Sequence, residues 1–402
     1  MHKIQSLLRS RPVFDFQNAP DRRHTYSIKW SIGEDEFPMF IADMDFKTAP
    51  AVSRAIRNKA ALDVYGYHKV PSVFFEAVAD WQQRRHGWAV NPSQILYCEG
   101  VMPGLASALR HLTQPGEKVV ALSPVYHHFY SAVRDNARDL VLCPLDCEDG
   151  NYRINFARLE QTLLDSQAKL LMFCNPHNPA GIVWSEKDLI RLGQLCDKHN
   201  VLVFSDEIHA DLTDREARYT PFAKASSLCA RQSVVAISPS KAFNLAGLHT
   251  ASLVIENEAL REKVRAGLHA DMVDEPNAFS IEATLAAYTE SDDWLNELVA
   301  HLAVIKRYAC QHLVEHCPGI KVSYPQASYL LWIDCSALTD NTDELADFLR
   351  ETTGLIVTKG GVFAGNGQSY LRMNVAMPFS LLEEGLARFV RGWNAYRQGQ
   401  IS

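Results

Sequence analysis

The sequence lacks the features that mark several large classes of protein. Its longest apolar runs, such as 169–174 and 201–204, are far shorter than the roughly 20 residues that cross a bilayer. No run of Lys and Arg stands out and the net charge is −7, which argues against nucleic acid as a partner. Residues 1–11 have no apolar core followed by a small-residue cleavage site, so we do not expect a signal peptide.

The spacing of the cysteines gives no indication of a metal-binding site. The nine cysteines are scattered and none has Cys-x-x-Cys spacing. The closest pair, Cys143 and Cys147, has no further His or Cys at metal-finger distance. We therefore expect reduced thiols, a cytoplasmic protein and no bound metal.

Several nucleotide and hydrolase motifs are also missing. The chain has no Gly-x-Gly-x-x-Gly fingerprint and no Walker-type Gly-Lys-Ser/Thr, which weakens a nucleotide-binding interpretation. It has neither a Gly-x-Ser-x-Gly elbow nor His-Glu-x-x-His, which weakens the serine hydrolase and zinc protease interpretations.

Short apolar runs alternate with helical patterns in the middle of the chain. We expect strands near 170–174, 201–204, 234–237 and 251–255. A helix from about Ser185 to His199 begins with a Ser-x-x-Asp capping box. Strands this continuous in apolar residues indicate an α/β fold, with a mostly parallel sheet covered by helices on both faces.

The length of 402 residues suggests more than one structural lobe. From about Asp293 a long helical pattern leads into short strands near 329–333 and 370–374, which predicts a smaller α+β domain. We divide the chain into an N-terminal segment (1–45) that packs on the small domain and over the cleft, a large domain (46–290) and a small C-terminal domain (291–402).

Polar residues follow three consecutive strands of the predicted sheet. Because such sheets bind ligands at the carboxyl ends of their strands, these residues form one candidate site. They are Asn178, Asp206, Ser238, Ser240 and Lys241.

Lys241 is the most informative of these residues. It lies in an otherwise uncharged stretch, 234–248. Burial lowers the pKa of a lysine, and an unprotonated amine can attack an aldehyde. A structural lysine fits the strand pattern equally well.

The other strand-end residues also allow two interpretations each. Asp206 is either a turn or cap residue, or an acid that keeps a ring nitrogen protonated. Asn178 lies in a turn-rich stretch, where its amide could instead donate to a ligand oxygen. His209 with Asp206 or Asp211 resembles a metal pair, but no third ligand is visible nearby.

Three further features fit a ligand site. Tyr126 follows the strand 118–122 and either belongs to the core or stacks on a planar ring. Residues 99–104 open a helix whose first N–H groups, at Val101 and Met102, suit a phosphate. Arg372 lies in a late apolar strand, where a guanidinium can fork onto a carboxylate.

Together these motifs resemble the fold-type I pyridoxal-phosphate (PLP) enzymes, the large aminotransferase-like family. Asn178, Asp206, Ser238 with Lys241, and Arg372 occur in the family's order. Within the family the chain is most similar to the carbon–sulfur β-lyases of the cystathionine β-lyase and cystalysin type. The resemblance covers nearly the whole chain and includes segments 29–30, 42–46, 65–67, 205–211, 240–244 and 328–332.

The resemblance implies a role for each motif. Lys241, Asp206 and Tyr126 would be catalytic: Lys241 anchors PLP and acts as the base, and Asp206 keeps the ring protonated. Arg372, with Asn178 and Tyr67, would bind the substrate. The residues expected to contact PLP are Val101, Met102, Tyr126, Asn178, Asp206, His209, Ser238, Ser240, Lys241 and Tyr67.

The resemblance also implies the reaction and the assembly. A small sulfur amino acid such as cystathionine would undergo α,β-elimination to a thiol, pyruvate and ammonia. Tyr67 would come from the neighbouring subunit, so that a homodimer shares its active sites. We expect no membrane and no nucleic-acid partner.

Two alternatives stay open at this point. The first is an aminotransferase on the same fold. Against it, His209 stands where aminotransferases usually carry a Tyr, and His249 is the only basic residue between Lys241 and Ser252, where they commonly carry an Arg. The second is a binding or regulatory protein that keeps the fold without turnover.

Overall fold

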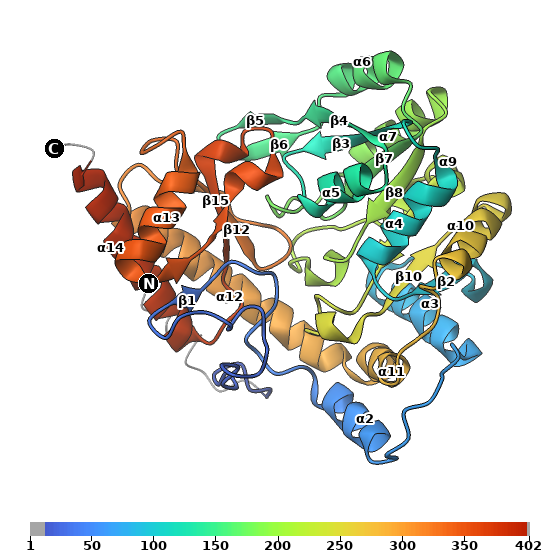
Figure 1. Ribbon diagram of the computed structural model, residues 1–402, viewed down its shortest axis with the longest axis horizontal. Coiled ribbons are helices and arrows are strands. Elements are labelled where there is room, and N and C mark those ends of the chain that lie inside the picture. Colours follow the sequence, from blue (N-terminus) through green and yellow to red (C-terminus); the bar gives the residue numbers. More distant parts are fainter. Residues whose placement is uncertain (1–12, 400–402) are drawn as a thin grey trace.

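The computed structural model describes residues 13–399 and contains two main sheets (Figure 1). The larger sheet has seven strands in the order β2-β10-β9-β8-β7-β3-β4. Their bounds are β2 Ile95–Cys98, β3 Lys118–Ser123, β4 Asp139–Pro144, β7 Leu170–Cys174, β8 Leu202–Asp206, β9 Ser233–Ile237 and β10 Ala251–Val254. The expected α/β class with a mostly parallel sheet is confirmed.

The directions of the strands in this sheet determine the edge at which the candidate site residues lie. Strands β4, β3, β7, β8 and β9 pair in parallel. Strand β10 was expected only as a further strand of a mostly parallel sheet, and it runs antiparallel to both β9 and β2. Strand β2 therefore points the same way as the parallel group. The carboxyl ends of β2, β3, β7, β8 and β9 meet at one edge.

Helices cover both faces of the large sheet. Because side chains alternate along each strand, successive residues of a strand are buried on opposite faces. In β3, Val119 and Ala121 pack with one group of helices, and Val120 and Leu122 pack with the other. The first group is α4 Val101–Leu112, α5 His128–Asp135 and α10 Glu258–Ala270. The second group is α6 Phe156–Ser166, α7 Glu186–Lys198, α8 Phe222–Ala225 and α9 Ser227–Arg231.

Helix α7 matches the helix expected from its periodicity. Leu189, Leu192 and Cys196 are buried on its inner face. The Ser185 hydroxyl accepts from the Asp188 N–H at 3.2 Å, which caps the first turn. Asp188 accepts from that hydroxyl at 2.6 Å, so the carboxylate supports the cap through the side chain of Ser185.

The C-terminal part forms a second, antiparallel sheet in the order β11-β12-β15-β14. The strands are β11 Lys321–Val322, β12 Leu330–Asp334, β14 Thr358–Lys359 and β15 Tyr370–Asn374. Its helices are α12 Asp292–His316, α13 Thr342–Thr353 and α14 Phe379–Gly399. Figure 1 shows α12 extending from beside this sheet toward α11 Ser280–Glu290.

The described part of the N-terminal segment lies against the C-terminal part. Strand β1 (Phe37–Pro38) pairs in parallel with β13 (Leu355–Ile356). Phe16 is fully buried and packs against Trp294 of α12 at a ring-centroid distance of 5.8 Å. Residues 1–12, which belong to the expected segment 1–45, lie outside the described residues. The domain boundaries at 45 and 290 stay predictions.

Of the remaining elements, α2 and α3 lie on the lower right side of Figure 1, β5 and β6 pair into a two-stranded sheet near its top, and the others are short connections. The bounds of these elements are α2 Pro50–Ala60, α3 Ser72–His86, β5 Asp146–Glu148, β6 Asn151–Arg153 and, for the 3₁₀ turns, η1 Pro92–Gln94, η2 Ala210–Leu212, η3 Ala246–Leu248, η4 Gly360–Phe363 and η5 Gly367–Ser369. Within residues 13–399, no helix is both long and apolar enough to cross a membrane.

Candidate active site

A cavity of about 380 Å³ opens at the edge where the parallel strands end. Residues from the N-terminal segment, the large sheet and the small sheet all line it. It contains most of the side chains that the sequence singled out, namely Val101, Met102, Tyr126, Asn178, Asp206, His209, Ser240, Lys241 and Arg372.

Lys241 follows β9 and reaches toward the N-terminal segment. Its Nζ donates a hydrogen bond to the carbonyl oxygen of Ala42 at 2.8 Å. Burial, together with the positive charge of Arg372, lowers the pKa of Lys241 to about 8, although Asp43 and Asp206 act in the opposite direction. The amine is therefore easier to deprotonate than that of an exposed lysine.

Asp206 ends β8 with its carboxylate inside the cavity. Burial raises the pKa of Asp206 to about 6, although the Ile208 N–H and the charge of Lys241 both lower it. Its Oδ1 accepts from the Ile208 N–H at 3.1 Å, and no other residue among 13–399 donates to this carboxylate. One oxygen is thus free to accept from a cationic N–H on a ligand.

His209 lies three residues after Asp206 and is buried. Burial lowers the pKa of His209 to about 3, with further lowering by Lys241 and Arg372, so the imidazole is neutral. Its Nδ1 has no hydrogen-bond partner among the described residues. A buried polar atom that lines a cavity and lacks a partner is typical of a site that accepts a ligand.

Arg372 lies in the middle of β15, between β12 and β14. Its Nη1 donates to Asn178 Oδ1 at 3.1 Å, and its Nη2 donates to the carbonyl oxygen of Phe40 at 3.3 Å. The guanidinium also lies 4.9 Å from the centre of the Phe363 ring. Burial lowers the pKa of Arg372 only to about 10, so it stays charged near neutral pH. It meets only neutral acceptors, which leaves its charge available for an anion.

The beginning of α4 provides a second anion site in the cavity. Gly100 precedes the helix in an extended conformation, and no side chain caps the first N–H groups, which belong to Val101 and Met102. Such free groups attract a phosphate. Ser240 lies on the cavity wall.

Ser238 does not line the cavity, but it holds Ser240 in place. The two hydroxyls lie 2.9 Å apart, and the Ser238 Oγ accepts from the Ser240 N–H at 3.1 Å. Ser238 also donates to the Thr250 carbonyl at 2.6 Å. Ser238 therefore supports Ser240, and its expected contact with the cofactor stays a prediction.

Sequence reasoning gave no role to several contributors to the cavity wall, among them Ala42, His127 and His128. Ala42 supplies the carbonyl that Lys241 contacts, 199 positions away in the chain. His127 and His128 directly follow Tyr126, and their rings lie 4.2 Å apart. Burial lowers the pKa of His127 to about 4, and it raises that of Tyr126 to about 12. Their adjacency to Tyr126 was the signal that could have found these two histidines.

Tyr67 lies outside the cavity in this chain, far more exposed than Ser238. Its side chain is fully exposed, at 103% of the reference area. It lies in an extended segment between α2 and α3. The expected contact of Tyr67 with the cofactor of a neighbouring subunit stays a prediction.

The comparisons with known proteins agree with this geometry. Residues 35–389 match the family described as aminotransferase class I and II. The cystathionine beta-lyase PatB of Bacillus subtilis is 37% identical over 380 residues, covering 93% of this chain and 98% of that protein. The chain belongs to the class I and II aminotransferase family.

Solved structures place the chain more closely within that family. Cystalysin from Treponema denticola, whose structure contains a pyridoxal 5'-phosphate cofactor, aligns with a TM-score of 0.92 at 28% identity, over 96% of this chain and all of that one. The PLP-bound C–S lyase from Staphylococcus hominis aligns with a TM-score of 0.89 at 29% identity, over 95% and 98%. The resemblance to carbon–sulfur lyases that the motifs indicated is confirmed.

Proposed function

We propose that this chain is a PLP-dependent carbon–sulfur β-lyase that eliminates a thiol from cystathionine or a related cysteine conjugate, leaving pyruvate and ammonia. The observation that carries the proposal is that Lys241, Asp206 and Arg372 line one cavity. This chemistry requires three groups: an amine with a lowered pKa, a buried carboxylate with a free oxygen, and a guanidinium without a carboxylate partner.

The cavity fits the cofactor, and each part of PLP has a partner. Lys241 would hold its aldehyde carbon, and Asp206 would accept from its ring nitrogen. Asn178 would donate to its phenolic oxygen, and Tyr126 would stack on its ring. The start of α4, with Ser240, would hold its phosphate. When bound, PLP supplies an electron sink for the negative charge that develops at the α-carbon of an amino acid.

Asp206 is well placed to keep that ring charged. In the cofactor-free chain its pKa is about 6 because burial penalises the carboxylate. A protonated ring nitrogen beside Asp206 would form an ion pair with its carboxylate. That pair compensates for the hydration lost on burial and favours the ionised form of Asp206. The pair would lose this benefit if the side chain at position 206 were neutral.

Two residues of the chain would then act on the substrate. Arg372 would bind the α-carboxylate through its guanidinium and so fix which bond of the α-carbon faces Lys241. The Lys241 amine would remove the α-proton as a general base, which its lowered pKa makes possible near neutral pH. Departure of a thiol from the β-carbon would follow.

The choice of a lyase over an aminotransferase rests on the residues around the ring. His209 is neutral and buried at the position where aminotransferases usually carry a Tyr. The stretch between Lys241 and Ser252 has no Arg, and His249 is its only basic residue. The relative with 37% identity is named as a cystathionine beta-lyase.

The proposed active enzyme is a homodimer in which Tyr67 of one subunit completes the cofactor site of the other. The exposed segment before α3 supports this assembly, because it carries several large apolar side chains that a second subunit would cover. They are Leu62, Val64, Tyr65 and Tyr67. The nine cysteines are all free thiols, which supports a cytoplasmic location.

The test compares two reactions of the PLP-loaded enzyme. One sample receives cystathionine, and the release of thiol and pyruvate is followed. A second receives an amino acid and a keto acid, and amino-group transfer is followed. We expect elimination to dominate. Transfer without thiol release would contradict the lyase assignment and favour the aminotransferase.

A variant pair tests the central residue of the same proposal. Lys241→Ala should abolish thiol release and remove the visible absorbance of the covalently held cofactor. The matched control is Lys263→Ala, because Lys263 is exposed on α10 and lies outside the cavity. Thiol release by Lys241→Ala at a rate near that of the control would refute the role of Lys241.

A further inference from the structure

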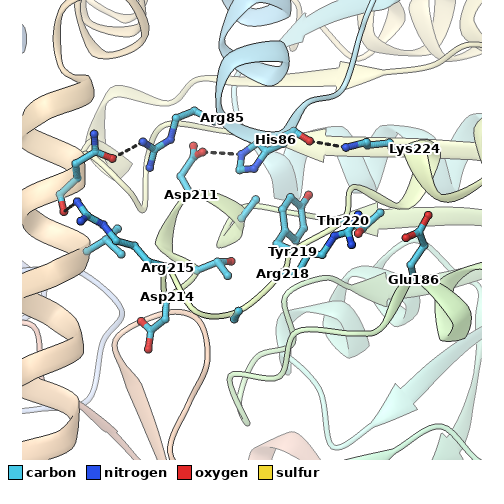
Figure 2. Close-up of a pocket in the computed structure, with 15 residues that line it drawn as sticks. Arg85, His86, Glu186, Asp211, Asp214, Arg215, Arg218, Tyr219, Thr220 and Lys224 are labelled. Atoms are coloured by element: carbon cyan, nitrogen blue, oxygen red, sulfur yellow. Dashed lines mark hydrogen bonds and ion pairs between the residues drawn. The ribbon is translucent and has the colours of Figure 1, made fainter.

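A second pocket, of about 400 Å³, lies between α3, α12 and the loop that follows η2. Figure 2 shows its labelled side chains arranged around one hollow. It shares no lining residue with the active-site cavity. The chain segment that carries Asp206 and His209 into the first cavity continues into the second through Asp211 and Asp214.

Four cationic side chains line this pocket, and none forms an ion pair with a carboxylate among residues 13–399. Arg85 donates to the Asn296 Oδ1 at 2.5 Å, and Arg215 donates to the Asn296 carbonyl at 3.2 Å. Lys224 donates to the His86 carbonyl at 2.8 Å. Arg218 is exposed and has no partner among the described residues. Arg85 also lies 5.4 Å from the centre of the Trp81 ring, so these four charges meet neutral oxygens, an aromatic face or solvent but no carboxylate.

The carboxylates on the same wall are already engaged. Asp211 accepts from the Trp81 indole at 3.1 Å and lies 2.8 Å from His86 Nε2. Asp214 pairs with the fully buried Lys306 at 2.7 Å. These two acids are fixed by the core, so they are not free to turn toward the arginines.

One lining carboxylate lies apart from both of these acids. Glu186 is exposed at the start of α7 and forms no ion pair with the four cations. The lining thus has more positive charge than its own acids neutralise. This surplus is notable because the whole chain has a net charge of −7.

We propose that this pocket binds a small polyanion that carries phosphate or carboxylate groups. Guanidinium groups present planar pairs of N–H donors that match both kinds of oxyanion. Charges held in a pocket attract a counter-ion more strongly than charges spread over an open surface. The volume suits a ligand of metabolite size.

The chemistry of the wall disfavours other ligand classes. A cation would face four like charges, while two of the three lining carboxylates are already engaged by the core. An apolar molecule would have to displace water from these charges without any polar contact in return. The backbone carbonyls that now accept from Arg215 and Lys224 are weaker partners than an oxyanion. An arriving anion would therefore gain charge-assisted hydrogen bonds that the pocket does not make by itself.

Binding is measured by titration calorimetry on the PLP-loaded enzyme, so that the result does not depend on the proposed reaction. Pyrophosphate and succinate are the two probes, and sodium chloride at matched ionic strength is the blank. Loading with PLP occupies the phosphate site at α4. A dicarboxylate that instead bound Arg372 in the first cavity would not respond to changes at Arg218.

The variant is Arg215→Gln with Arg218→Gln, which removes two exposed charges from the pocket. The matched control is Lys263→Gln with Arg391→Gln, which removes two exposed charges that lie outside both pockets. Loss of a hydrogen bond to a charged group corresponds to a weakening of roughly tenfold or more. We expect at least that loss in the pocket variant and no more than twofold in the control.

The two probes distinguish the sources of the anion. Stronger binding of pyrophosphate indicates a phosphate-bearing ligand, and stronger binding of succinate indicates a dicarboxylate; either result supports the site if the pocket variant loses it. Heats no larger than the sodium chloride blank for both probes would overturn the proposal. So would equal affinities for the pocket variant and its control.

Discussion

Replacing Arg372 by Lys is the sharpest test of how the active site would recognise an amino acid. The substitution keeps the positive charge but removes the planar pair of donors. In the structure, one guanidinium nitrogen contacts Asn178 at 3.1 Å and another contacts the Phe40 carbonyl at 3.3 Å. The single ammonium of a lysine cannot make both contacts and also bind a carboxylate through two parallel hydrogen bonds.

The expected size of the effect follows from the lost bond. One hydrogen bond to a charged group contributes about 1.5–3 kcal/mol, which corresponds to a fall in kcat/KM of roughly 10- to 150-fold. Because Arg372 would hold the substrate carboxylate throughout the reaction, most of the fall should appear as a higher KM. Arg372 does not contact the proposed anchor or ring acid directly, so the visible spectrum of bound PLP should be retained.

The assay measures thiol and pyruvate from cystathionine over a range of substrate concentrations. The control is Arg350→Lys, a surface residue that pairs with Glu36 and is 55% exposed, which should change kcat/KM by less than about twofold. Thermal unfolding of both variants checks that they fold. A kcat/KM for Arg372→Lys within threefold of the unmodified enzyme would refute the carboxylate-binding role.

Three other predictions concern stability and assembly. Lys306→Met should lower the unfolding free energy by about 3–5 kcal/mol in chemical denaturation because it leaves Asp214 buried without its cation, whereas the exposed Lys321→Met should cost less than about 1 kcal/mol. Burial raises the pKa of Glu207 from 4.5 to about 7, so the cofactor-free protein should lose stability, on the order of 3 kcal/mol, as pH rises from 4.5 to 7. Glu207→Gln should flatten that slope in denaturation curves measured across the range, and an unchanged slope would contradict it. Tyr67→Phe should weaken PLP retention on dialysis while leaving the unfolding temperature of the cofactor-free protein within about 2 °C, since the exposed ring makes no buried contact in its own chain; unchanged retention would argue against the shared site.

The sign of the Glu207 effect follows from proton binding. Between pH 4.5 and 7 the folded carboxyl keeps a proton that the unfolded one has released, so rising pH favours unfolding. Glu207 accepts hydrogen bonds from the Tyr219 hydroxyl, the Phe222 N–H, Ser205 and Asn175, and these bonds lower its pKa only in part. The opposite sign would show that the network holds Glu207 ionised.

The sequence alone determined the elements and the residues that end them. Buried parallel strands are continuous apolar runs, so Leu170–Cys174 was visible without any tertiary information. Because the carboxyl ends of parallel strands share one edge, Asn178, Asp206 and Lys241 were expected together, and the structure does place them around one cavity. A helix was also expected to begin within residues 99–104, and α4 begins at Val101.

Tertiary structure decided which distant segments meet. The hydrogen bond from Arg372 to Asn178 joins positions 194 apart, and that from Lys241 to Ala42 joins positions 199 apart. Strand β10 is as apolar as its neighbours, so its reversed direction has no signature in its own residues. The second pocket draws its cations from α3, α8 and a loop that are scattered through the sequence. Periodicity and capping depend on near neighbours in the chain, whereas these contacts depend on how buried faces pack, and only the folded chain fixes that.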